Sequence, residues 1–274
     1  STGQLQADGV KARRAEQTMG AQQLKARWAL GELAQAGQPW MLDARGTQLS
    51  WAGWSLPSLW ATVQGQRTDH RIELQAQAVM PERKSSHGQR IREPVRLSVA
   101  AQAGWRGSLH APVWEARVSQ LRVQPEAPSA AAWLETSPFE LRWAQPSNGP
   151  AWSVSSARAK VFGAELVVER ASGEQRDGLV GTDLVVALQP LKVSEVLGRW
   201  QPDAGWGGDL TIAGRLTAVR PPGGVWRIDG QLARQAGDLS LSEPGVGGAS
   251  AQRLGIRDIK LGLSAANGLW QFSH

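Results

Sequence analysis

Residues 72–78 carry the sequence IELQAQA, in which apolar and polar side chains alternate at every position. Successive side chains of a β-strand point to opposite faces of a sheet, so this alternation predicts a strand with one apolar and one polar face. The same pattern recurs along the chain between Gly, Pro, Asn, Asp or Ser residues that favour turns. It is found near residues 24–30, 95–101, 139–143, 166–168, 184–188, 210–216, 226–232, 239–241 and 259–263.

These strands predict an all-β fold, a long sheet with one apolar side and one solvated side. In several strands the alternation changes phase. The apolar positions Trp114, Ala116 and Val118 are followed by Leu121 and Val123, and Leu254 and Ile256 are followed by Ile259, Leu261 and Leu263. Such an odd step moves the apolar side chains to the other face unless a bulge or bend intervenes. Bent strands would let the sheet curl around its apolar side. We therefore expect an elongated curled sheet, a β-taco or open β-solenoid groove, with an apolar inner face.

Helix is scarce in the sequence. Residues 190–200 are the best candidate, because their apolar side chains recur near helical spacing and Pro202 follows them. Residues 129–134 are a weaker candidate. A connecting turn fits either segment equally well, so we expect one or two short helices.

The composition excludes several classes of function. The chain has 274 residues, no Cys, no Tyr and 14 Trp, and its 30 Lys+Arg against 24 Asp+Glu give a formal charge of +6. Without Cys there is no disulfide scaffold, thiolate metal site or cysteine nucleophile. The positive charge is dispersed and is nearly all Arg, which the codons of a GC-rich genome explain without an anionic partner. Most Trp share the face of Leu and Val, which argues against a stacking platform for nucleic acid.

The sequence shows no catalytic constellation. The motifs GxSxG, HExxH and GxxxxGK[ST] are absent. Asp69-His70 abuts an expected hairpin turn, and Glu165 and Glu169 lie on the polar side of an expected strand. The four His residues have no spacing typical of a metal site: His70, His87, His110 and His274. We therefore predict that the chain is not an enzyme and has no catalytic residue, metal site or cofactor.

Residues 81–94 form the longest strongly polar segment, and a proline stands at each end of it. Flanking alternation makes a long exposed hairpin loop the natural interpretation. Its basic side chains are either simply solvated or contact phospholipid headgroups. The residues concerned are Arg83, Lys84, Arg90 and Arg92.

The Trp residues stand mostly beside expected strand starts. They either fill wide core positions and cap the sheet ends, or line an apolar channel and anchor it to lipid.

Several segments between residues 180 and 274 carry the short patterns W-x-P, G-x-L and R-x-x-G-D-L. They are Trp200-Gln201-Pro202, Gly208-Asp209-Leu210, Gly214-Arg215-Leu216 and Arg234-Gln235-Ala236-Gly237-Asp238-Leu239. This part of the chain resembles the TamB family, the periplasmic subunit of the translocation and assembly module, within the AsmA-like group. Its motifs are structural and contain no catalytic residue.

The resemblance implies a tapering, taco-like β structure in the periplasm of a Gram-negative bacterium. Complete members have an N-terminal inner-membrane helix and a C-terminal domain that meets an Omp85-type outer-membrane barrel protein. The sequence shows neither. We therefore expect a single elongated β domain over residues 1–274, an interior fragment of a longer envelope-spanning protein anchored in the inner membrane.

The expected function is a non-enzymatic conduit whose apolar groove conducts phospholipid acyl chains between the membranes. Each methylene buried there contributes about 0.8 kcal/mol. One alternative is a scaffold that assembles outer-membrane proteins such as autotransporters, in which an unfolded client adds a strand to a sheet edge. Another is a β-helix adhesin or polysaccharide-binding protein, which predicts a closed core and a carboxylate cluster that the sequence does not show.

The residues expected to line the groove are the apolar positions of the C-terminal strands. They are Leu184, Val186, Leu188, Leu210, Ile212, Leu216, Trp226, Ile228, Leu232, Ile259, Leu261 and Leu263.

Overall fold

The structure is a computed structural model of the chain, and most of its residues are in β-strands. The strands pair antiparallel and only one short helix occurs in the described part, so the all-β prediction is confirmed. The structure describes residues 1–14, 17–31, 37–51, 54–79, 83–84, 90–91, 94–108, 111–126, 131–145, 151–176, 179–201, 204–242, 251–266 and 269–273.

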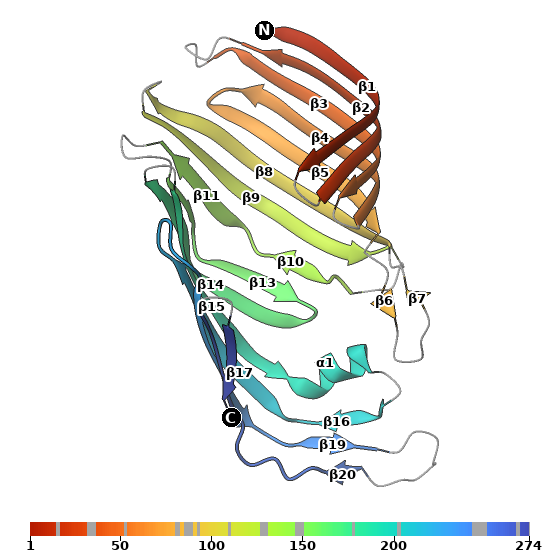
Figure 1. Ribbon diagram of the computed structural model, residues 1–274, viewed down its shortest axis with the longest axis vertical. Coiled ribbons are helices and arrows are strands. Elements are labelled where there is room, and N and C mark those ends of the chain that lie inside the picture. Colours follow the sequence, from red (N-terminus) through yellow and green to blue (C-terminus); the bar gives the residue numbers. More distant parts are fainter. Residues whose placement is uncertain are drawn as a thin grey trace. The chain divides into compact units, whose positions relative to one another are not determined.

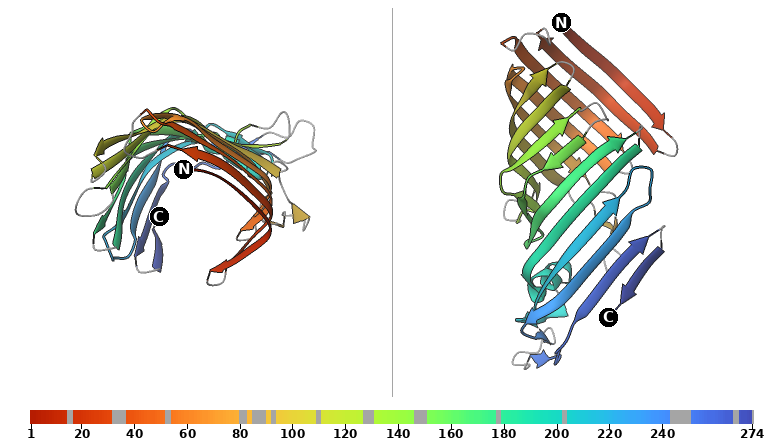
Figure 2. Two further views of the ribbon diagram at one scale, coloured as in Figure 1. Left: turned by 90° about the horizontal axis from the view of Figure 1, so that it is seen from above. Right: turned by 90° about the vertical axis from the view of Figure 1, so that its left-hand side faces the viewer.

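The chain separates into two compact units, residues 1–145 and residues 146–274. Each unit is described by itself. We expected a single domain over the whole chain, and that expectation stays a prediction. The long strands of both units curve along their length (Figure 2).

The first unit is built on one antiparallel sheet (Figure 1). The strand order is β1-β2-β3-β4-β5-β8-β9-β11, and β10 also pairs with β9. A separate hairpin, β6 and β7, lies between β5 and β8 in the sequence. The bounds are β1 Thr2–Arg14, β2 Gln17–Leu30, β3 Pro39–Trp51, β4 Trp54–Gln66, β5 Asp69–Val79, β6 Arg83–Lys84, β7 Arg90–Ile91, β8 Pro94–Ser108, β9 Ala111–Pro125, β10 Leu134–Thr136 and β11 Phe139–Ala144.

The register of this sheet places the apolar side chains on one face. Leu74 of β5 pairs with Ala61 of β4 and with Val99 of β8. Val99 in turn pairs with Leu121 of β9. Because side chains alternate between faces, Glu73 and the other intervening polar residues belong to the opposite face.

The phase change predicted in β9 is a β-bulge. The register of β8 and β9 shifts between Ala100 and Ala101, which leaves Ser119 as the extra residue. Its hydroxyl donates a hydrogen bond to the backbone oxygen of Ala100 at 3.2 Å. The extra residue keeps Val118 and Leu121 on the same face of the sheet, so of the bulge or bend that we expected here the structure shows the bulge.

The second unit has a main antiparallel sheet with the order β13-β14-β15-β17-β18-β21-β22, and β12 also pairs with β14. A small sheet of β16, β19 and β20 lies beside the helix. The bounds are β12 Ala151–Val154, β13 Ala157–Val161, β14 Ala164–Arg176, β15 Leu179–Lys192, α1 Val193–Trp200, β16 Trp206–Gly208, β17 Thr211–Arg220, β18 Arg227–Ala236, β19 Leu239–Leu241, β20 Gln252–Arg253, β21 Lys260–Ala266 and β22 Leu269–Ser273.

Helix α1 confirms the stronger of the two helical candidates, although it begins three residues later than expected, at Val193. The weaker candidate is not helical where it is described: residues 129 and 130 lie outside the described residues, and Leu134 begins β10. No helix in the described segments is long and apolar enough to cross a membrane.

Little of the chain is deeply buried. Leu210 is the only large side chain in the described part that is less than 2% exposed, and most other buried apolar residues are Ala. The structure exposes 17892 Å². Two compact domains sharing the mass equally would together expose about 13,900 Å². Part of the exposed area is apolar, because large side chains such as Leu261, Trp270 and Phe272 are 48%, 57% and 79% exposed.

Candidate functional site

The apolar side chains of the second unit form rows that cross neighbouring strands. In the first row, Leu188 of β15 pairs with Leu166 of β14 and with Gly214 of β17. Gly214 pairs with Leu232 of β18, which pairs with Leu261 of β21. Directly paired residues have Cβ atoms about 4.5–5.5 Å apart, so Leu166 can contact Leu188 and Leu232 can contact Leu261, while Gly214 stands between the two pairs.

A second row lies two residues away along each strand. Leu216 of β17 pairs with Val186 of β15 and with Gly230 of β18. Gly230 pairs with Leu263 of β21, which pairs with Phe272 of β22. The two rows make a continuous apolar surface over six strands.

The glycines in these rows leave a cleft in the apolar surface. Gly214 lies in the first row and Gly230 in the second, on adjacent strands. The cleft has a volume of about 300 Å³. Its apolar lining consists of Leu166, Val186, Leu188, Leu216, Leu232, Leu261, Leu263 and Phe272.

The two glycines differ in what a side chain would meet. A Cβ on Gly214 would collide with a backbone oxygen of β18 and with the side chain of Leu232, so the close approach of the strands requires glycine there. A Cβ on Gly230 would lie 3.4 Å from Cδ1 of Leu216 and 3.6 Å from Cβ of Leu263. Those distances are ordinary van der Waals contacts, so the space above Gly230 would accept a methyl group.

The cleft brings together half of the predicted groove residues. Leu184 and Ile228 lie on the same face, one row further along, and both pair with Ala218. The residues in the cleft itself are Val186, Leu188, Leu216, Leu232, Leu261 and Leu263.

The remaining predicted groove residues lie outside the cleft. Leu210 is 1% exposed, and its backbone oxygen accepts a hydrogen bond from the N–H of Val193 at 2.9 Å, so it belongs to a small core beside α1. Ile212 lies where the register of β17 and β18 shifts. Trp226 precedes β18 and is 42% exposed, and Ile259 precedes β21.

Sequence reasoning missed the parts of the cleft that depend on pairing. Leu166 and Phe272 were not expected to line it, and Gly214 and Gly230 were not expected to form its floor. Alternation assigns a residue to a face but does not identify its partner on the next strand. The G-x-L pattern at residues 214–216 was the available signal.

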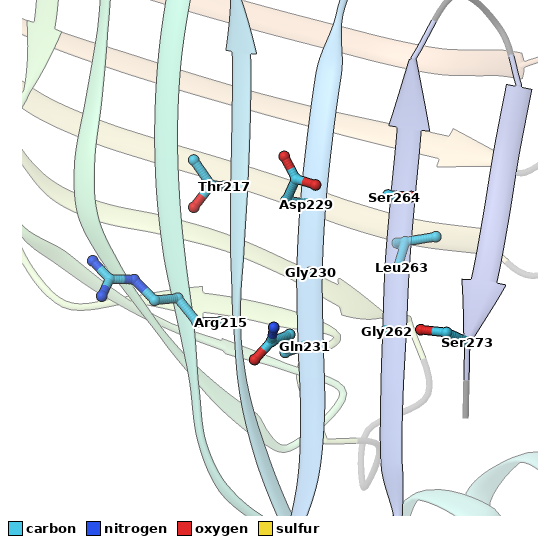
Figure 3. Close-up of a pocket in the computed structure, with 9 residues that line it drawn as sticks. All are labelled: Arg215, Thr217, Asp229, Gly230, Gln231, Gly262, Leu263, Ser264 and Ser273. Atoms are coloured by element: carbon cyan, nitrogen blue, oxygen red, sulfur yellow. The ribbon is translucent and has the colours of Figure 1, made fainter.

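The opposite face of the same strands is polar (Figure 3). Asp229 of β18 pairs with Thr217 of β17 and with Ser264 of β21. A hollow of about 360 Å³ lies here, and Arg215 beside it forms an ion pair with Glu169 at 2.5 Å. One layer of backbone thus separates a solvated surface from an apolar one.

Asp238 joins the small sheet to the segment that precedes β21. Its carboxylate accepts hydrogen bonds from the backbone N–H groups of Ile256 at 2.9 Å, Leu239 at 2.8 Å and Gly255 at 3.0 Å. The bond from Ile256 is the largest cause that lowers the pKa of Asp238, and it outweighs the desolvation that would raise it. The pKa of Asp209 is lowered chiefly by the hydrogen bond that its carboxylate accepts from the N–H of Asp238 at 3.0 Å. Both carboxylates thus hold backbone in place.

His70, in the first unit, is a core residue. It is 2% exposed, and its ring stacks on Trp40 with centroids 5.5 Å apart. Nδ1 lies 3.1 Å from a backbone oxygen of the preceding turn, and the indole N–H of Trp114 points to Nε2 at 3.5 Å. The adjacent Asp69 carboxylate instead accepts a hydrogen bond from a glutamine of β8. The pair is therefore not arranged as an acid–base dyad.

The basic segment is described only in part. Arg83 and Lys84 form β6, and Arg90 begins β7. Arg92 lies outside the described residues. Headgroup contact by these residues stays a prediction.

In the part of the chain that the structure describes, no group of three or more His, Asp or Glu residues is placed to hold a metal ion. Comparison with protein-family models, with curated proteins and with solved structures finds no significant match. The geometry of the apolar cleft is therefore the basis for a functional proposal.

Proposed function

We propose that the chain is a non-enzymatic segment of a TamB-like bridge in the periplasm of a Gram-negative bacterium, and that its apolar face holds phospholipid acyl chains. The observation that carries this proposal is the apolar cleft over Gly214 and Gly230. Its exposed lining is mainly hydrocarbon, although Arg215, Gln231 and Ser273 also border it, so it suits an apolar ligand better than a polar one. A hydrocarbon chain in the cleft would gain roughly 25 cal/mol for each Å² of apolar surface removed from water.

The rows around the cleft extend its reach. They run from Leu166 of β14 to Phe272 of β22, across five gaps between neighbouring strands. At about 4.8 Å for each gap, the apolar surface is about 24 Å wide. A surface of this width is long enough to contact most of an extended acyl chain, not only its terminal methyl group.

The test compares two neighbouring positions on opposite faces of β17. Leu216→Asp places a charge in the cleft, whereas Thr217→Asp places the same charge on the solvated face. We expect Leu216→Asp to lose most of the binding of a fluorescent fatty acid to the whole chain, and Thr217→Asp to keep it. Equal binding by both variants, or none by the unchanged protein, would contradict the proposal.

The wider setting is part of the same proposal. The full-length protein would be anchored in the inner membrane and would meet an Omp85-type barrel protein at the outer membrane. The support for this setting is the resemblance of residues 180–274 to the TamB family.

A further inference from the structure

On the polar face of the first unit, several arginines are paired with carboxylates; Arg45, for example, lies 3.2 Å from Asp43. Arg96 and Arg122 depart from this pattern. In the described segments neither of them forms an ion pair. Their charge is therefore available to an external anion.

Arg96 and Arg122 are diagonal neighbours on β8 and β9. Arg122 pairs with Ser98, and Arg96 pairs with Gln124, two residues further along. Diagonal positions are about 7–8 Å apart, so the long side chains of Arg96 and Arg122 can both reach one anion on this face. The Nε atom of Arg122 is buried and has no hydrogen-bond partner. An anion between the two side chains would relieve their repulsion and supply acceptors for the donors of both guanidinium groups.

Two glutamines flank Arg96 on the neighbouring strands. Gln77 of β5 pairs with Arg96, and its side-chain oxygen accepts a hydrogen bond from the hydroxyl of Ser58 at 3.0 Å. That bond directs the NH₂ group of Gln77 to other acceptors. Gln124 lies on the other side of Arg96. These amides add uncharged donors beside the two cations.

Two carboxylates lie near the pair in the register. Glu135 is opposite Arg122, and Glu126 follows the end of β9. Neither is within ion-pair distance of an arginine of the pair in the described residues. Their negative charges lower the net positive charge of the site, but they do not neutralise either arginine by a direct ion pair.

The surroundings favour a lipid headgroup as the source of the anion. Arg96 lies near the end of the sheet where β5 ends at Val79 and β8 begins at Pro94, and the sequence that joins these two strands has four basic residues. Trp60 lies on the polar face and pairs with Gln75. Trp and basic residues together are typical of surfaces that meet the headgroup layer of a membrane. We propose that Arg96 and Arg122 bind the phosphate group of an anionic phospholipid headgroup.

The test measures co-sedimentation of the whole chain with vesicles. We expect it to associate with vesicles of phosphatidylglycerol and phosphatidylcholine, and not with phosphatidylcholine alone. Arg96→Gln combined with Arg122→Gln should weaken this association roughly tenfold or more. The matched control combines Arg27→Gln with Arg71→Gln. It also removes two positive charges, elsewhere on this face, and should weaken the association with vesicles less than about threefold.

Other outcomes overturn the proposal. Equal weakening by both double variants would show that only net charge matters, and no association with anionic vesicles would exclude the site. Binding of inorganic phosphate, measured by calorimetry, without association with vesicles would make it a free-phosphate site instead. If circular dichroism shows that the Arg122→Gln variant is unfolded, the test uses Arg96→Gln alone, because Arg96 is exposed. The acyl-chain titration of the cleft is a separate measurement, so failure here leaves the proposed function standing.

Discussion

Gly230 lies directly opposite Leu216 in the register of β17 and β18, and a methyl group on Gly230 would sit 3.4 Å from Cδ1 of that leucine. The space between them is thus produced by an absent side chain. It is not produced by a backbone conformation that only glycine adopts. This relationship makes the volume of the cleft adjustable by a single substitution.

Gly230→Ala should fill the floor of the cleft and leave the fold intact. We expect a stability gain of about 0.4–1 kcal/mol, because alanine restricts the unfolded chain. Displacing one methylene of a bound chain should cost about 0.8 kcal/mol, or roughly fourfold in affinity. Urea unfolding and a fatty-acid titration measure the two effects. Ser264→Ala, on the solvated face of β21, is the control, and unchanged affinity in a folded Gly230→Ala protein would refute the role of the cleft.

Leu210 and Leu261 should respond very differently to truncation. Leu210 is 1% exposed and Leu261 is 48% exposed. Leu210→Ala should lower the free energy of unfolding by about 2–5 kcal/mol, because it leaves a cavity in a packed core. Leu261→Ala should lower it by less than about 1 kcal/mol, because that side chain is already half in water. Urea unfolding followed by tryptophan fluorescence measures both, and the reverse order would mean that Leu210 lies in the groove after all.

Acid should release the segment that Asp238 holds. The pKa of Asp238 is below its ordinary value of 3.8 in the folded protein, so its hydrogen bonds stabilise the fold above that value. The stabilisation is lost as the pH falls through the lower folded pKa. The amide NMR resonances of Gly255 and Ile256 should therefore stay constant down to about pH 4 and move only below it.

Asp238→Asn removes the charged acceptor in that experiment. The two amide resonances should then be displaced already at neutral pH and should not titrate. Asp229→Asn, which removes an exposed carboxylate from the solvated face, is the matched control and should leave them in place. Titration of the unchanged protein above pH 4 would contradict the assignment.

Alternation was sufficient to predict the central parts of many strands and the faces of their residues, but it did not identify β1, β3 or β4. Over residues 72–78 of β5 and 95–99 of β8 the polar and apolar positions alternate at every residue, and burial of one face then fixes the register. The bulge at Ser119 was also predictable, because Val118 and Leu121 share a face only if one residue is extra. Helix α1 followed from helical spacing and a proline just beyond it.

The cleft was predictable only in part. Leu210 has the same spacing as Leu216, so alternation assigned both to one face. In the structure Leu210 precedes β17, and the register then shifts between Thr211 and Ile212. Such a break, like the pairing of Gly230 with Leu263, depends on which strands lie next to each other. Local sequence carries no information on that long-range choice.

The pairing in β17 and β18 has a consequence for how such a chain evolves. Neighbouring residues of one strand, such as Leu216 and Thr217, belong to two surfaces that share no packed interior. A substitution at one position therefore does not require repacking at the next. Selection that acts on the solvated surface and selection that acts on the apolar surface can therefore proceed in the same short segment, at alternate codons.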